Sequence, residues 1–229
     1  MNSILPPRLV WKRRLLRLLR GKPDSYLRSC RGVIHVGANI GQERDLYASL
    51  NLKVVWIEPI PAVYEKLCRN IAGYSNQMAI RALIADREGI NLSLHIANND
   101  GASSSILEPS PLLNDIWPEI DFIDKKIMRC TTLPNALADY HVDLSQFDAL
   151  VMDTQGSELV VLRGAEALLS HFNYIFTEAA DFELYKGCPT GHQISEYLAA
   201  HGFRKKLTDE FARRDQVGSC FNLLFERIN

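Results

Sequence analysis

The segment Val33–Gln42, with the sequence VIHVGANIGQ, constrains this chain more than any other part of it. A short apolar run leads directly into the loop GANIG at residues 37–41, which is the pattern of a strand that turns sharply into a helix. Glycine is needed at such a turn, because a Cβ would obstruct both the tight backbone and the close approach of a ligand. The segment therefore predicts the first strand and turn of a βαβ unit that binds a nucleoside.

A carboxylate closes the next strand-like run, KVVWI. Glu58 follows this run, 21 residues after Gly37, and an acid in this place can accept hydrogen bonds from both hydroxyls of a ribose. A dinucleotide-binding loop has a second glycine where this chain has Asn39, so that a pyrophosphate can lie against the backbone. Asn39 favours a nucleoside without phosphates, such as S-adenosylmethionine. The alternative is a tight turn followed by a surface glutamate, since lone glycine motifs are often false positives.

The composition fits one α/β domain with a full core, because the 229 residues are 47% hydrophobic and 23% charged. The net charge of -1 is unevenly distributed. Residues 1–22 hold seven basic and no acidic residues, whereas residues 23–229 hold 19 basic and 27 acidic residues. An acidic main part argues against a nucleic-acid partner, because phosphate contacts need clustered Lys and Arg.

The basic N-terminal segment has the spacing of an amphipathic helix. Apolar residues of segment 8–20 recur on one helical face, and basic residues surround them (Trp11, Leu15, Leu18 and Leu19; Lys12, Arg13, Arg17 and Arg20). We therefore expect an N-terminal extension at residues 1–30 and a main domain at residues 31–229. The helix could dock on the main domain, which we favour because apolar stripes usually face protein, or it could contact an anionic membrane surface peripherally.

Cysteine usage and hydropathy indicate where in the cell the protein is located. The five cysteines are an odd number without a C-x-x-C pair, which indicates reduced thiols rather than a zinc or redox site. No apolar run approaches the ~18 residues that a membrane span needs, and arginines interrupt the N-terminal leucines, unlike a signal peptide. We expect a cytoplasmic protein whose membrane contact, if it exists, is peripheral.

From Gly32 onward, strand-like runs alternate with helical segments, which is typical of a doubly wound parallel sheet. The strand-like runs end at Val36, Ile57, Ala85, Met152 and Phe176. The helical segments are residues 42–50, 63–71, 157–171 and 193–201, and the last begins with a capping box formed by Thr190 and Gln193.

Two hairpins depart from this alternation. Residues 203–210 and 220–228 predict a C-terminal hairpin that adds an antiparallel strand to the parallel sheet, an ending that is typical of methyltransferases rather than of dehydrogenases. Residues 88–132 contain two further strand-like runs around a small-residue loop and a Pro-rich stretch. We interpret them as an inserted hairpin with a mobile cover.

Acidic residues stand at the carboxyl ends of the predicted strands, where open α/β sheets bind their ligands. Asp153 follows the apolar run ALVM, where a carboxylate is costly to bury unless it is bonded or liganded. Glu178 closes the next run, and together the two could bind a divalent cation such as Mg²⁺ or orient substrate hydroxyls without a metal. Asp86 follows the third run and suits an adenine amino group, although a turn cap explains it equally well.

Two further residues have competing explanations. His192 lies near the start of the last helix, from which it could reach the strand ends as a general base, but no partner for it is visible. Glu158 lies in the first turn of a helix, where the dipole and the free N–H groups favour an acid. We therefore assign His192, Asp153 and Glu178 to catalysis and Glu158 to helix capping.

Five segments together resemble the FkbM family of S-adenosylmethionine-dependent methyltransferases over about residues 32–205: VGANIGQ, IEPIP, ADREG, NDGASSS and DTQGSELVVLRGA. The resemblance implies a Rossmann-like class I methyltransferase fold with a mostly parallel seven-stranded sheet. It also implies O-methylation of a small-molecule or glycan acceptor, with the hydroxyl on a sugar, glycolipid or polyketide-type metabolite. It assigns the cofactor to the glycine loop and the following acid, namely Gly37, Ala38, Asn39, Gly41 and Glu58.

The chain departs from the family pattern at two places. His35 stands where the family usually has Asp before the Val of its first motif, and Thr154-Gln155 replaces the common Val or Ile with Glu. The second departure weakens the case for a metal site on that loop.

Three other functions remain open to the sequence. A nicotinamide-dependent oxidoreductase would need the glycine that Asn39 replaces. A non-catalytic S-adenosylmethionine-binding or membrane-associated protein would keep the glycine loop without needing Asp153 or Glu178. An RNA methyltransferase would depend on the basic N-terminus, but the fourth strand reads VMDTQG and lacks the NPPY-type motif of nucleic-acid N-methyltransferases.

Overall fold

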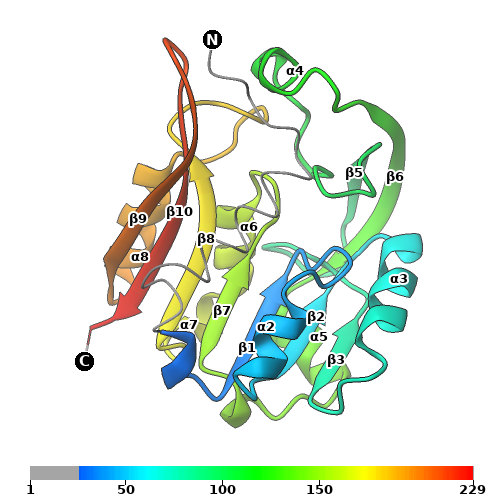
Figure 1. The fold of residues 1–229 in the computed structure, drawn as a ribbon, viewed down its shortest axis with the longest axis vertical. Helices are drawn as coiled ribbons and strands as arrows, with labels where there is room; N and C mark the ends of the chain where they lie inside the picture. The colour runs from blue at the N-terminus through cyan, green and yellow to red at the C-terminus, as the bar shows by residue number, and fades with distance from the viewer. Residues whose placement is uncertain (1–25, 229) are drawn as a thin grey trace.

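A seven-stranded sheet forms the centre of the protein (Figure 1). The computed structural model describes residues 26–228. The strands follow the order β3 (Gln77–Ile80), β2 (Lys53–Ile57), β1 (Gly32–Val36), β7 (Ala149–Met152), β8 (Tyr174–Ala180), β10 (Gly218–Arg227) and β9 (Phe203–Arg214). The neighbouring pairs from β3 to β8 are parallel, and β10 pairs antiparallel with both β8 and β9. The predicted doubly wound sheet with a C-terminal antiparallel hairpin is confirmed.

Helices cover both faces of this sheet because the strand residues are apolar on both sides. All five residues of β1 are buried: Ile34 and Val36 face one core cluster, and Val33 faces another. The first cluster includes residues of α5 (Leu133–Asp139), α6 (Glu158–Gly164), α7 (Glu166–Leu169) and α8 (Gly191–Ala200). The second includes residues of α2 (Arg44–Ser49) and α3 (Pro61–Ile71).

The segment that the sequence predicted as one third strand divides between two sheets. β3 ends at Ile80, and the chain then leaves the main sheet to form β4 (Leu83–Ile84), which pairs with β6 (Phe122–Thr131). β6 also pairs antiparallel with β5 (Asn91–Ala97), so residues 88–132 contain an antiparallel pair of strands. The short helix α4 (Pro111–Ile116) lies between β5 and β6 in the chain.

The predicted helix at residues 157–171 is broken. α6 ends at Gly164 and α7 begins at Glu166. Gly164 lies so close to the carbonyl oxygen of Ala85 that a Cβ there would be 2.0 Å from it, which explains why the helix has a glycine at this position. The capping box of α8 is confirmed, because the Thr190 side chain accepts from Gln193 N and the Gln193 side chain accepts from Thr190 N.

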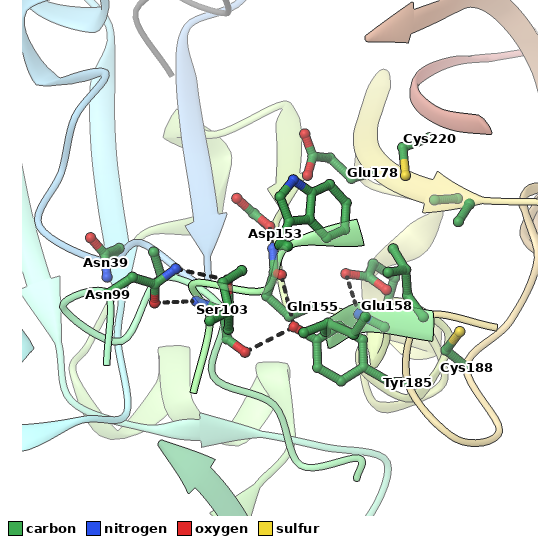
Figure 2. Close-up of a pocket in the computed structure, with 18 of the residues that line it drawn as sticks. Asn39, Asn99, Ser103, Asp153, Gln155, Glu158, Glu178, Tyr185, Cys188 and Cys220 are labelled. Carbon is green, nitrogen blue, oxygen red and sulfur yellow. Dashed lines mark hydrogen bonds between the residues drawn. The ribbon is translucent and has the colours of Figure 1, made fainter. Parts of the chain in front are cut away.

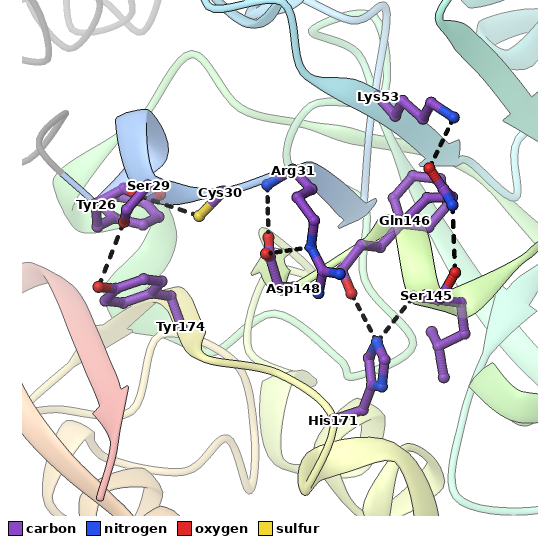
Figure 3. A network of polar contacts seen from close by, with 12 residues as sticks. Tyr26, Ser29, Cys30, Arg31, Lys53, Ser145, Gln146, Asp148, His171 and Tyr174 are labelled. Carbon is purple, nitrogen blue, oxygen red and sulfur yellow. Dashed lines mark hydrogen bonds and ion pairs between the residues drawn. The ribbon is translucent and has the colours of Figure 1, made fainter. Parts of the chain in front are cut away.

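The described part of the N-terminal extension packs near the amino ends of the parallel strands. Tyr26 and Leu27 are buried, and the ring of Tyr26 stacks on Phe176. Both the backbone N–H and the Nε of Arg31 donate to the buried Asp148 carboxylate at 3.0 Å (Figure 3). The predicted basic helix at residues 8–20 lies outside the described residues. Within residues 26–228, the structure contains no helix with the length and apolarity that a membrane crossing requires.

Candidate functional site

The carboxyl ends of β1, β2 and β7 point toward the end of the molecule where α4 and the inserted hairpin lie (Figure 1). Two adjoining cavities lie at these strand ends, one of about 60 Å³ and one of about 360 Å³. Asn39, Ala102, Asp153 and Gln155 line both cavities. The site is therefore a pair of connected compartments with Asp153 at the boundary between them.

The glycine loop forms the wall of the smaller cavity. Gly37 has a φ of 80°, and a Cβ there would lie 2.0 Å from the carbonyl oxygen of Asp153. The N–H groups of Gly37 and Ala38 both donate to the Ile57 carbonyl oxygen at 3.0 Å. Only glycine allows β1, β2 and the loop after β7 to meet this closely, which is the physical basis of the motif in the sequence.

Glu58 is buried beside this loop, with 4% of its surface exposed, and it lines the smaller cavity. Its Oε2 accepts a hydrogen bond from Asn39 N, and its Oε1 accepts one from Ile60 N, both at 2.9 Å. Burial raises the pKa of Glu58 to about 7, and the two backbone hydrogen bonds oppose this rise. The carboxyl group is thus fixed by two different N–H donors in the wall of the smaller cavity.

Residues 98–106, which we call the cover segment, close the cavities from the side of the inserted hairpin. Asn39 Nδ2 donates to the Asp100 carbonyl oxygen at 2.9 Å. On the other side, Ser105 Oγ donates to the Gln155 carbonyl oxygen at 2.7 Å, and Tyr185 OH donates to the Ser103 carbonyl oxygen at 2.8 Å. The cover segment is thus hydrogen-bonded to both the glycine loop and the loop after β7.

Four acidic residues line the larger cavity: Asp100 of the cover segment, and Asp153, Glu158 and Glu178, which are labelled in Figure 2. Asp153 follows β7, and its Oδ1 accepts a 2.6 Å hydrogen bond from Gln155 Nε2. Glu178 lies inside β8, which extends to Ala180 rather than ending at Phe176 as predicted. The parallel pairing of β7 with β8 brings Glu178 to the same cavity as Asp153.

Glu158 begins α6, and its side chain holds the loop that precedes this helix. Its Oε1 accepts from Thr154 N at 3.0 Å and from Gly156 N at 3.2 Å, so it binds N–H groups of the loop rather than the free N–H groups of the helix start that the sequence predicted. It is also 3% exposed and lines the larger cavity. Burial, followed by the nearby charge of Asp153, raises the pKa of Glu158 to about 7. Glu158 therefore belongs to the site.

Tyr185 also belongs to the site, although nothing in the sequence singled it out. It is 2% exposed, lines the larger cavity and holds the cover segment through Ser103. It comes from the irregular connection between β8 and α8, where neither periodicity nor a motif marks a residue.

The structure does not bring two predicted site residues to the cavities. Asp86 follows β4, which has left the main sheet, and its carboxylate lies 4.0 Å from Arg87 Nε. The His192 side chain is 79% exposed in the first turn of α8, with Nδ1 3.3 Å from Glu196 Oε2. Neither residue lines either cavity. Within residues 26–228, the structure has no group of three or more His, Cys, Asp or Glu side chains placed to bind a metal ion.

Two solved methyltransferase structures have a similar fold. The magnesium protoporphyrin IX methyltransferase ChlM of Synechocystis PCC 6803, solved with bound SAH, has a TM-score of 0.51 and 11% identity, over 96% of this chain and 82% of ChlM. The methyltransferase domain of bacterial CtHen1 has a TM-score of 0.52 and 10% identity, over 95% of this chain and 99% of that domain. The predicted fold, a class I methyltransferase sheet, is therefore confirmed.

The Methyltransferase FkbM domain matches residues 35–205, so the chain belongs to this family. The 2-O-methyltransferase NoeI of Sinorhizobium fredii (strain NBRC 101917 / NGR234) is similar, with 28% identity over 187 residues, which are 76% of this chain and 71% of NoeI. The protein is thus an S-adenosylmethionine-dependent methyltransferase. The sequence had left an oxidoreductase and a non-catalytic protein open as alternatives, and this family assignment favours the methyltransferase over both.

Proposed function

We propose that this enzyme transfers a methyl group to a hydroxyl of a sugar, glycolipid or secondary metabolite. The observation that carries the proposal is the pair of carboxylates, Asp153 and Glu178, in a cavity that adjoins the compartment of Glu58. Carboxylates accept hydrogen bonds from hydroxyl groups, so these two side chains suit an alcohol acceptor. The similarity to a 2-O-methyltransferase supports an oxygen acceptor.

The residues around the smaller cavity fit S-adenosylmethionine. Glu58 offers its carboxyl group to ribose hydroxyls, and the glycine loop of Gly37, Ala38, Asn39 and Gly41 allows close approach of the ligand to the backbone. The smaller cavity is far below the ~300 Å³ of typical small-molecule sites, and Gly101 and Ala102 of the cover segment line it. Cofactor binding therefore requires the cover segment to move outward.

The bound cofactor supplies an electrophilic methyl group, and the protein orients the acceptor. In this proposal Asp153, held by Gln155, would bind the acceptor hydroxyl and accept its proton while a lone pair of the hydroxyl oxygen forms the new O–CH3 bond. The C–S bond to the methyl group would break with its electron pair left on the sulfur of S-adenosylhomocysteine, and water would then take the proton from Asp153. Because a carboxylate is a weak base for an alcohol, most of the acceleration comes from orientation. Glu178 holds the same hydroxyl or its neighbour, either directly or through Mg²⁺.

Calorimetric titration with S-adenosylmethionine and, separately, with NAD⁺ tests the cofactor. We expect binding of the first alone, because Asn39 occupies the place of the glycine that a pyrophosphate needs. Preference for NAD⁺ would contradict the assignment of the glycine loop.

Release of S-adenosylhomocysteine, measured over a panel of glycosides and hydroxylated metabolites with tRNA as the nucleic-acid control, tests the acceptor. We expect turnover with a hydroxyl compound and none with tRNA; the opposite result would contradict the proposal. Repeating the assay with EDTA and then with added Mg²⁺ decides whether Glu178 acts directly or through the ion.

We also propose that the basic segment at residues 8–20 packs on the protein and that the enzyme acts in the cytoplasm. Sedimentation with vesicles of neutral or anionic lipid tests the first statement. Binding to anionic vesicles alone, lost in a variant without residues 1–22, would instead support the peripheral membrane role.

A further inference from the structure

Several apolar side chains line the larger cavity together with its carboxylates. Leu113, Trp117 and Ile120 come from α4 and the chain after it, Leu184 from the connection between β8 and α8, and Phe211 from β9. The volume of about 360 Å³ is at the lower end of the range for small-molecule sites. The cavity thus has room for one or two rings that can pack against aromatic side chains.

The cavity disfavours negative charge, and four of its own residues show this. Burial raises the pKa of Glu158 to about 7 and that of Cys220 to about 12, and it also raises the pKa values of Tyr185 and Cys188. In each residue a second cause acts in the same direction, namely the negative charge of a neighbouring acid. Each group is held toward its uncharged form.

The sources of this field are the lining acids themselves. The charge of Asp153 acts on Glu158 and Tyr185, the charge of Glu158 acts on Tyr185 and Cys188, and the charge of Glu178 acts on Cys220. Within residues 26–228, no Lys, Arg or His side chain lines this cavity. A carboxylate or phosphate on a ligand would meet the same desolvation and the same repulsion as these four side chains.

From this geometry we infer that the methyl acceptor enters as an uncharged, hydroxyl-bearing ring compound with an apolar face, and that anionic relatives of the same shape are excluded. This inference rests on the proposed function, because it takes the larger cavity as the acceptor site. It separates neutral glycosides and metabolites from uronic acids, phosphorylated sugars and nucleotides.

A pair of matched probes tests the inference directly. Phenyl β-D-glucopyranoside and phenyl β-D-glucuronide have nearly the same shape and differ only at C6, which is the carbon of a hydroxymethyl group in the first and of a carboxylate in the second. Their dissociation constants are measured by calorimetry at pH 7.5, with the enzyme saturated with S-adenosylhomocysteine. We expect the glucuronide to bind at least about tenfold more weakly. The ratio should persist at high salt, because charges in a buried site are screened far less than surface charges.

Two carboxylate-to-amide variants test whether a charge in the cavity wall causes the weaker binding of the glucuronide. Glu178→Gln should reduce the ratio of the two dissociation constants severalfold, because it removes one lining charge at nearly constant shape. Glu196→Gln is the matched control, since Glu196 lies on α8, has a side chain that is 67% exposed and does not line the cavity. The control should leave the ratio unchanged.

Equal or tighter binding of the glucuronide would overturn the inference. Failure of both probes to bind at about 20 mM would also overturn it, because a specific site should have a dissociation constant below this concentration. Titration with S-adenosylmethionine distinguishes these failures from failure of the proposed function. A protein that binds the cofactor but prefers the anionic probe remains a methyltransferase with a different acceptor class.

Discussion

Glu58 and Glu158 are chemically alike, equally buried and both have a pKa raised to about 7, yet we predict opposite responses to replacement by glutamine. The difference lies in their hydrogen bonds. Glu158 accepts both of its backbone hydrogen bonds on one oxygen, Oε1, whereas Glu58 accepts one on each oxygen. An amide offers only one acceptor oxygen, so it can reproduce the first arrangement but not the second.

The magnitude for Glu158 follows from its pKa. A rise from 4.5 to about 7 means that ionisation in the folded protein costs about 3 kcal/mol. Because the folded-state pKa is raised, the stabilising contribution is fully present below pH 4.5 and is lost as the pH rises through 7. Glu158→Gln has no charge to bury and keeps both hydrogen bonds. It should therefore match the unaltered protein at pH 5 within about 1 kcal/mol and exceed it by up to about 3 kcal/mol at pH 8.

Glu58→Gln removes the same buried charge but places an NH₂ group against Asn39 N or Ile60 N. One buried donor then loses its acceptor, at a cost of about 1–3 kcal/mol. We expect this variant to be less stable than the unaltered protein at pH 5, and less stable than Glu158→Gln by about 1–3 kcal/mol at every pH.

Urea unfolding of the three proteins at pH 5 and pH 8, followed by tryptophan fluorescence, gives these differences directly. Equal stability of the two variants at pH 5 would refute the hydrogen-bond argument. Lower stability of Glu158→Gln than of the unaltered protein at pH 8 would refute the argument from buried charge.

Three further predictions concern the reaction and its cover. Asp153→Asn should lower turnover at least about a hundredfold, the usual contribution of general acid–base catalysis, while calorimetry shows cofactor affinity within about twofold of the original. Full activity would remove Asp153 from the reaction. Gly37→Ala should abolish cofactor binding and lower the melting temperature, because its Cβ would lie 2.0 Å from the Asp153 carbonyl oxygen at a φ of 80°. A variant with normal binding would mean that the loop is more plastic than its contacts imply. Tyr185→Phe should cost about 1 kcal/mol of stability and speed cofactor dissociation in stopped-flow measurements, since the Ser103 carbonyl oxygen loses its donor. An unchanged dissociation rate would show that Tyr185 does not restrain the cover segment.

The elements that the sequence predicted well are those whose signals are local. β1, β2 and β7 are mainly apolar runs, as is typical of strands buried on both faces, and the glycine loop follows from the crowding of three chain segments at Gly37. The capping box of Thr190 and Gln193 involves residues three positions apart. Each signal comes from a neighbour in sequence or from a backbone constraint at one residue, so it can be read without the fold.

The misplaced residues depended on contacts between distant segments. The run AIRALIA is apolar except for Arg81, and only pairing with β6 assigned its second half to another sheet and moved Asp86 away from the cavities. His192 was assigned by its distance along the chain, but the direction of its side chain depends on which face of α8 packs on the sheet.

By itself, the sequence determined a doubly wound sheet with a glycine loop after the first strand, an acid after the second and a carboxylate after the fourth parallel strand of the domain. These follow from backbone sterics and apolar periodicity, which act over a few residues. Only the tertiary structure decided that Glu158, Glu178 and Tyr185 share a cavity with Asp153, because their meeting depends on strand pairing and on the course of the connection after β8. Electrostatic fields and burial act through space, and for that reason the chemical character of the larger cavity emerged only from the fold.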